Sequence, residues 1–365
     1  MRGGHAVALA AFAFIVARPV VGQQCSAVSE TIAVLGAIED PVSPTSPIGV
    51  SIAGAPFGWI IAEPRYPVAI YAPSGAFTAL PIREGEGPRE LLRPERVAVD
   101  PTDTTWVSDS RGRAVLIDPS GTPVRTVSHP ELRSIVGFSP SGLPFALLSA
   151  PATDGAIGRQ SPLFAQFFTR NGAPLHRVGL GGEIALAYGV RNPPSWVAED
   201  EHTMIAPGGA ESWMKRVSDE EEVVVPLASV RSRLTALGYE EDAHIGASAV
   251  VSDGSGGFWV LGGVRVLGRE EEARLAARIQ KVEGYSRDVS AVLRAAPSVR
   301  HAVWDGVLSH VGPDGALDAV LVTETLPERL LPGPFSVHYT DHPETGLIRA
   351  HISSIALTCP GRRQE

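Results

Sequence analysis

Potential metal ligands are most concentrated at His338, Asp341 and His342. Two histidines four residues apart would share one face of a helix, which is a common arrangement for a metal pair. This segment instead has the pattern of a strand that ends in a Pro-Glu-Thr-Gly turn, which leaves at least His342 in solvent. His301 and His310 are scattered in the same way. We therefore predict no metal and no cofactor.

A serine nucleophile on a sharp strand-to-helix turn is suggested only superficially, by the stretch 137–142. The Pro-Ser-Gly core of this stretch recurs elsewhere in the chain, and it is better explained as a turn. The glycine-rich stretches 179–182 and 254–257 also read as turns, because neither opens a helix after a parallel strand as a phosphate-binding loop would. The sequence therefore shows no assembled catalytic motif.

Charged and polar side chains do gather in the stretches 63–66, 83–86 and 109–113. The candidate ligand-binding residues in them are Arg65, Arg83, Glu86, Asp109 and Arg111. A structural alternative exists for each of them. Asp109 and Arg113, for example, would form an ion pair that merely fixes a turn, and an exposed pair contributes about 0–1 kcal/mol.

A repeat of 46 or 47 residues positions these stretches. Residues 58–80 consist of short apolar runs around a Pro-Ser-Gly turn, and residues 105–127 repeat the pattern. A looser copy spans residues 145–175 and ends around an Asn-Gly turn. Such turns are strong hairpin signals, because glycine and asparagine tolerate a positive φ.

The later copies are more degenerate. Further strands are predicted at residues 196–198, 203–206, 249–251, 257–261, 307–310, 319–322, 335–339 and 347–357. Units of four strands and 40 to 60 residues favour the blades of a β-propeller. A β-sandwich is the second choice, because it would not need a long-period repeat. Residues 269–280 are rich in helix formers and are predicted to be a helical or irregular excursion on the fifth blade, with a charged outer strand as the alternative.

The two ends of the chain are predicted to close the ring. Residues 31–34 match residues 78–81 in position, and an inner strand follows each segment at a similar spacing. We therefore expect the N-terminal strand to complete the last blade by pairing antiparallel with a C-terminal strand. This pairing would bring Cys25 and Cys359 together as a disulfide, for which two free thiols are the alternative.

The N-terminus has the features of an export signal. An apolar run from Ala6 to Ala17 follows a short polar start, and the run is too short to span a bilayer. We predict a signal peptide over 1–22 and a single propeller domain over 23–365, located in the periplasm or secreted. The alternative is a buried or membrane-anchoring helix. No later segment is long and apolar enough to cross a membrane, and the residues before Cys25 do not form a lipoprotein cleavage pattern.

Composition argues against several classes of protein. The chain has 38 glycines and 31 prolines, too many for a helix bundle but suited to short strands and tight turns. Its formal net charge is −9, and Lys215 and Lys281 are its only lysines. A nucleic-acid partner is therefore not expected, since such a protein normally shows a clustered basic surface.

The stretch from Gly85 to Asp118 resembles the blade junction of NHL-like six-bladed propellers. It combines Gly85-Glu-Gly-Pro-Arg-Glu-Leu91 with an aromatic residue (Trp106), an aspartate (Asp109), a polar loop and an arginine (Arg113) before the next strand. The resemblance implies an all-β, six-bladed β-propeller. Similar rings carry calcium-dependent lactonases and amidating lyases, but the lactonase pattern needs asparagine ligands. The two asparagines of this chain, Asn171 and Asn192, are instead placed at a turn and before two prolines.

The function expected from the sequence is that of a binding or scaffold module for a peptide, a glycan or a small ligand. The first alternative is a hydrolase or lyase that uses acid and base residues at the mouth of the propeller channel. Paired carboxylates with perturbed pKa values at that mouth would favour the enzyme. A purely structural role in an envelope assembly is a third possibility.

Overall fold

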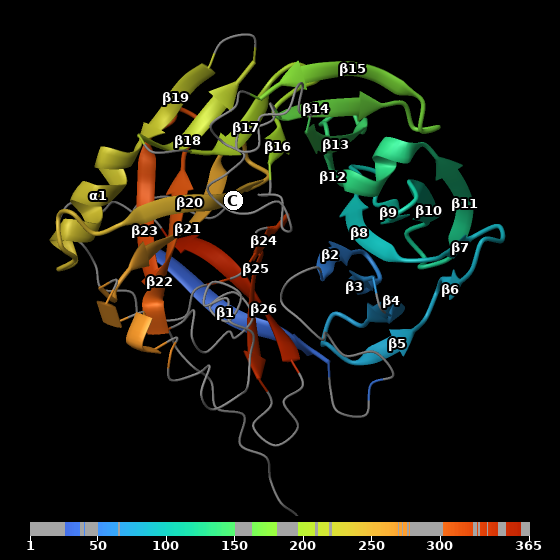
Figure 1. Cartoon of the computed structure of the whole chain (residues 1–365), viewed down its shortest axis with the longest axis horizontal. Coiled ribbons are helices and arrows are strands. Elements are labelled where there is room, and N and C mark those ends of the chain that lie inside the picture. The colour runs from blue at the N-terminus through green and yellow to red at the C-terminus, as the bar shows by residue number, and fades with distance from the viewer. Residues whose placement is uncertain are drawn as a thin grey trace, which may run out of the picture.

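Short apolar strands and tight turns fold into six antiparallel four-stranded sheets in the computed structural model, which is a six-bladed β-propeller (Figure 1). The predicted fold is thereby confirmed. The structure describes residues 26–36, 40, 50–64, 66–149, 163–180, 196–208, 211–218, 221–268, 270–271, 273–275, 277, 302–323, 327, 329–333, 335–341 and 348–358. Cys25, Cys359, Arg65, His301, His342 and the predicted signal peptide lie outside these ranges.

The blades follow one another along the chain. Blade one contains β2 (Ser51–Ala55), β3 (Gly58–Glu63), β4 (Tyr66–Tyr71) and β5 (Phe77–Ala79). Blade two contains β8 (Pro94–Val99), β9 (Thr105–Asp109), β10 (Arg113–Ile117) and β11 (Pro123–Ser128). Blade three contains β12 (Ile135–Phe138), β13 (Pro144–Ser149), β14 (Leu163–Phe168) and β15 (Pro174–Gly179). Blade four contains β16 (Val197–Ala198), β17 (Met204–Pro207), β18 (Ser212–Val217) and β19 (Glu221–Pro226). Blade five contains β20 (Ile245–Ser252), β21 (Phe258–Arg265), β22 (Trp304–Val311) and β23 (Leu317–Thr323). Blade six contains β24 (Arg329–Leu331), β25 (Phe335–Asp341), β26 (Ile348–Thr358) and β1 (Ser26–Leu35).

The first strand of each blade lies at the centre of the ring. β2, β8, β12, β16, β20 and β24 each contact the equivalent strands of the two neighbouring blades. These six inner strands therefore surround the axis of the ring, as Figure 1 shows. A short parallel pair, β6 (Arg83–Glu84) and β7 (Glu90–Leu91), lies in the connection between blades one and two.

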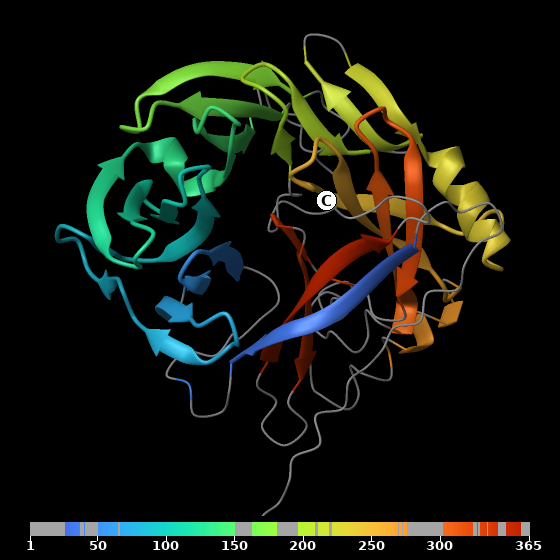
Figure 2. The same cartoon turned by 180° about the vertical axis from the view of Figure 1, so that it is seen from behind.

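The ring closes as the sequence predicted. β1 pairs antiparallel with β26 from Ser26 opposite Thr358 to Leu35 opposite Ala350, with one irregularity near Ile32. Figure 2 shows the blue N-terminal strand lying along the red C-terminal strands. The outer strand of blade six thus comes from the opposite end of the chain to its other three strands.

A five-residue turn recurs at the hairpins, with a side-chain acceptor at its first position in many copies and a positive φ at its fourth. In one copy the Asp118 Oδ1 accepts hydrogen bonds from the main-chain amides of Ser120 and Thr122, at 2.9 and 3.0 Å. The fourth residue has a positive φ, which glycine adopts without strain. It is glycine in seven turns, at Gly75, Gly112, Gly121, Gly142, Gly172, Gly256 and Gly315, but aspartate at Asp103, with φ 63°.

Helical segments interrupt the repeat in places. The described residues between 270 and 277 are helical and lie between β21 and β22, so the predicted excursion on blade five is a helical one. A second helix, α1 (Leu227–Ala236), follows blade four and was not predicted. Its Leu227, Val230 and Leu234 are buried against blades four and five. Their spacing of three and four residues is the pattern of an apolar helix face.

The hydrophobic core is divided among the blade interfaces. Ile60 and Val68 of blade one pack with Val107 and Val115 of blade two in one such cluster. Between blades four and five, the buried Trp213 donates from Nε1 to the Ser309 Oγ at 2.7 Å. Within the described ranges, no helix is long and apolar enough to cross a membrane.

Candidate binding site at the channel mouth

All six inner strands begin on the same face of the ring, because each blade repeats the same strand order. We call this face the mouth face. The second strand of each blade runs back from the opposite face to the mouth face. The turn that joins the second strand to the third therefore also lies on the mouth face. In the register of blade two, Pro94 at the start of β8 lies opposite Asp109 at the end of β9.

Glu95 occupies an irregular position at the start of β8. The pairing of β8 with β9 shifts between Pro94 and Arg96, so Glu95 is the extra residue of a β-bulge. Bulges of this kind redirect a side chain and are common beside functional sites. Glu95 is half-buried, and its carboxylate forms no hydrogen bond or ion pair with any residue that the structure describes. A charge is thus held in a confined position without a direct partner.

The surroundings of Glu95 change its proton affinity. Burial has the largest effect and raises the pKa of Glu95 above the ordinary value of 4.5. The positive charge of Arg96 lowers this pKa and the negative charge of Asp109 raises it, while Arg133 and Arg93 lower it less. The net direction is upward, so burial and repulsion by Asp109 outweigh three arginines.

Asp109 is fully buried at the adjacent strand end. Its Oδ1 accepts hydrogen bonds from the amides of Arg111 and Arg113 at 2.9 and 3.0 Å, which closes the turn after β9. Its Oδ2 is buried and has no hydrogen-bond partner. The ion pair predicted between Asp109 and Arg113 is therefore not what fixes this turn. The turn is fixed through main-chain amides, whereas the Arg113 guanidinium donates to the Gly87 carbonyl at 2.7 Å.

Two arginines add positive charge at the same mouth. Arg96 is the third residue of β8, and Arg329 is the first residue of β24, in blade six. Burial lowers the pKa of Arg96 to about 10, with a further lowering by the charge of Arg329 and an opposing effect of Glu95. Arg96 remains protonated at neutral pH. It forms no hydrogen bond or ion pair within the described part of the chain.

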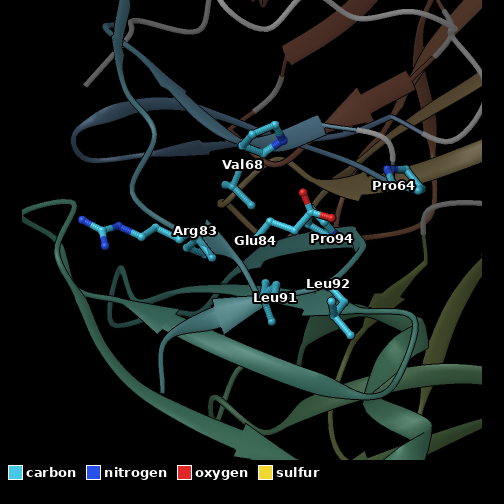
Figure 3. A pocket seen from close by; sticks show the side chains of 9 residues that line it. Pro64, Val68, Arg83, Glu84, Leu91, Leu92 and Pro94 are labelled. Atoms are coloured by element: carbon cyan, nitrogen blue, oxygen red, sulfur yellow. The ribbon is translucent and has the colours of Figure 1, made fainter. Parts of the chain in front are cut away.

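A separate small pocket lies between blades one and two (Figure 3). Its volume is about 30 Å³, enough for a methyl group or one water. The lining residues are Pro64, Pro67, Val68, Ile82, Arg83, Glu84, Leu91, Leu92 and Pro94. Figure 3 shows the Arg83 side chain extending away from the other lining residues, whereas Glu84 lies among them. This pocket is too small to hold a ligand by itself.

The structure separates the predicted site residues. Glu86 and Arg111 form an ion pair whose side chains are 65% and 63% exposed, and Arg83 is exposed on β6. Only Asp109 is among the charges that act on Glu95. Glu95 and Arg96 were not among the candidate residues predicted from the sequence. The signal for them was two adjacent charges within the otherwise apolar strand Pro94–Val99.

The predicted histidines that the structure describes, His338 and His310, have structural partners. His338 lies on β25 as predicted, and its ring stacks on His351 at 4.7 Å. On the face opposite the mouth, the buried His310 contacts Asp253 at 2.9 Å through Nε2 and Asp318 at 3.1 Å through Nδ1. This contact joins two hairpin turns of blade five. Among the described residues, no group of three or more side chains is arranged to hold a metal ion.

Comparison with known proteins assigns the chain to no family. No protein-family model matches the chain, and no curated protein matches its sequence. A Bacteroides fragilis protein described as exported has 10% identity and a TM-score of 0.48, over 90% of this chain and 95% of its own. An inactive virginiamycin B lyase from Staphylococcus aureus, solved with quinupristin, has 9% identity and a TM-score of 0.38, over 91% and 99%. Similarity this low assigns no function.

Proposed function

We propose that this protein is an exported, NHL-like propeller that binds a small polar ligand or a peptide or glycan end at its mouth face. The signal peptide is residues 1–22, the mature domain is residues 23–365, and the location is the periplasm or the cell exterior. The binding groups are Glu95 and Arg96, supported by Asp109 and Arg329. Arg65 and Arg83 are proposed as outlying contacts for a larger ligand, whereas Glu86 and Arg111 pair with each other at an exposed position and are not part of the proposed site.

The observation that carries this proposal is the pair of opposite charges at the start of β8. Both side chains are partly buried, and neither has a hydrogen bond or ion pair within the described ranges. A charge that is withdrawn from water without a partner costs free energy. Ionisable groups whose pKa values are perturbed in this way cluster at functional sites. The bulge at Glu95 supports the same conclusion, because it redirects this one side chain.

A second function is favoured by one specific feature, the proximity of two carboxyl groups. Burial and the charge of Asp109 raise the pKa of Glu95, and this is how proteins prepare a general acid. In this alternative Glu95 transfers the proton in a hydrolase or lyase reaction, and Asp109 keeps the proton affinity of Glu95 high. The binding function needs no such proton transfer.

The test uses thermal denaturation of the purified mature chain against a panel of amino acids, peptides, glycans and organic acids. A ligand that binds only the folded state stabilises it by about 2.7 kcal/mol at one hundred times its dissociation constant. Glu95→Gln and Arg96→Gln are expected to abolish the shift, whereas Glu86→Gln and Arg111→Gln keep it. A shift that survives both mouth substitutions rules out this site. Conversion of the bound compound would establish the enzyme instead.

We also propose a disulfide between Cys25 and Cys359. The support comes from the residues beside them, since Ser26 lies directly opposite Thr358 in the β1–β26 pairing. The Ser26 hydroxyl also donates to the Thr358 carbonyl at 3.3 Å. A disulfide at this end of the pair would lock the outer strand of blade six to the rest of the ring.

A further inference from the structure

We infer that the mouth recognises a zwitterion, with a free α-amino acid as the ligand class: Glu95 binds its ammonium group and Arg96 its carboxylate. The inference rests on the proposed function and names its ligand. It follows from the arrangement of charges, which is neither uniformly acidic nor uniformly basic. A plain anion would be repelled by the two carboxylates, and a plain cation by the arginines.

The negative part of the site is formed by blade two. Glu95 projects from the bulge, and Asp109 is at the end of the neighbouring strand, where the turn amides hold its Oδ1. The second oxygen of Asp109 is fully buried and lacks a hydrogen-bond partner. Its charge is therefore poorly neutralised by the protein and acts on the position of Glu95. A bound ammonium group would relieve this repulsion just as a proton does.

The positive part of the site comes from two blades. Arg96 belongs to blade two and Arg329 to blade six, and the inner strand of blade one contacts both of their strands. The charge of Arg329 acts on Arg96 across this gap. An arginine presents several N–H groups in a plane, which matches both oxygens of a carboxylate. Arg96 has no such acceptor among the described residues. A ligand carboxylate would supply it.

Glu95 and Arg96 carry opposite charges but do not form an ion pair with each other. They are consecutive in β8, and no contact within 4 Å joins their charged atoms, because the structure describes no ion pair for either residue. Their charges nevertheless act on each other, so the two charged groups lie near each other without pairing directly. A ligand with both charges satisfies both side chains at once.

The experiment measures binding of the twenty common L-amino acids to the mature chain by calorimetry. Each amino acid that binds is then compared with its amide, which lacks the negative charge, and with its N-acetyl form, which lacks the positive charge. We expect at least one free amino acid to bind, and each derivative to bind about tenfold more weakly or worse. Glu95→Gln should remove the preference over the N-acetyl form, and Arg96→Gln the preference over the amide.

Glu86→Gln and Arg111→Gln are the matched controls, because they remove the same charges from an exposed pair in the neighbouring connection. Arg96→Met, which removes the charge but keeps a long side chain, replaces Arg96→Gln if the latter fails to fold. Absence of binding by every amino acid at 10 mM, or derivatives that bind equally well, would overturn the inference. If another compound binds and depends on Glu95 and Arg96, the proposed function stands without the zwitterion. If binding ignores both residues, both ideas fall.

Discussion

Replacement of Asp109 tests whether one buried carboxylate holds the mouth of blade two together. Asp109→Ala removes two hydrogen bonds from main-chain amides to a carboxylate oxygen. Hydrogen bonds to charged groups contribute about 1.5–3 kcal/mol each, so the loss amounts to about 3–6 kcal/mol. Removal of the unpartnered Oδ2 returns about 1–3 kcal/mol, because that oxygen is buried without a partner. The midpoints of these two ranges leave a net destabilisation of about 2–3 kcal/mol.

Asp109→Asn separates the hydrogen bonds from the charge. The asparagine side chain keeps an oxygen at the position that accepts from Arg111 and Arg113, and it removes the negative charge. We therefore expect Asp109→Asn to stay within about 1 kcal/mol of the wild type. Urea unfolding followed by tryptophan fluorescence provides the measurement, because Trp106 lies on the same strand and is buried. The slope m should stay unchanged if only stability is altered.

Asp118→Ala is the matched control, since Asp118 accepts from two amides in the same kind of turn but at an exposed hairpin. It should destabilise the protein less than Asp109→Ala does. The reasoning is refuted if Asp109→Ala lies within about 1 kcal/mol of the wild type, or if Asp109→Asn is as damaging as alanine. In the second case the negative charge itself, rather than the pair of amides, would be the stabilising feature.

Three further predictions concern charge, backbone and covalent structure. Glu95→Gln should raise the melting temperature at neutral pH. The raised pKa of Glu95 means that the folded state loses stability as the pH rises above the unfolded-state pKa, and glutamine does not lose it. Near pH 4 the gain should vanish, and differential scanning calorimetry across pH 4–8 measures both limits. Asp103→Gly should stabilise the protein by about 0.5–1 kcal/mol in urea unfolding, since relief of a strained positive φ outweighs the added chain entropy. Gly121→Asp should do the reverse in the β10–β11 hairpin of the same blade. The oxidised mature chain should show no free thiol by mass spectrometry after alkylation, and Cys25→Ser with Cys359→Ser should lower its stability by about 2–5 kcal/mol.

Each of these outcomes has a clear contrary. A Glu95→Gln variant that gains as much stability at pH 4 as at pH 7 would contradict the pKa argument. A stability loss in Asp103→Gly would show that the Asp103 side chain makes a contribution greater than its backbone strain. Two alkylated thiols in the oxidised protein would establish the free-thiol alternative for the chain ends.

The ring and its closure were predictable because their signals are local. The Pro-Ser-Gly and Asn-Gly turns report a backbone conformation that needs glycine, and the apolar runs between them have the length of strands. The match of residues 31–34 to residues 78–81 gave the N-terminal strand its place on the last blade, as the β1–β26 pairing confirms. The helix α1 had a readable signal in the spacing of Leu227, Val230 and Leu234, but it falls outside the repeat.

The site was harder to predict, because it depends on register and on contacts between blades. Glu95 matters through a bulge, and no feature of the sequence shows where a pairing slips by one residue. Arg96 and Arg329 are 233 positions apart in the numbering, and only the circular arrangement of inner strands brings their charges together. Asp109 was identified, but its turn was expected to be fixed by the Arg113 side chain rather than by main-chain amides.

The shared sixth blade also sets the order in which this protein is able to fold. β1 is among the first segments to be synthesised, yet its partner strand lies more than three hundred residues later, with 332 positions between Ser26 and Thr358. Contacts this distant close slowly, because the entropy of ordering the intervening chain opposes them. Until β26 exists, the first five blades form an open arc, and β1 is an unpaired strand carrying the apolar Val28, Ile32 and Val34. The growing chain is therefore most prone to aggregation just before its last strand is complete.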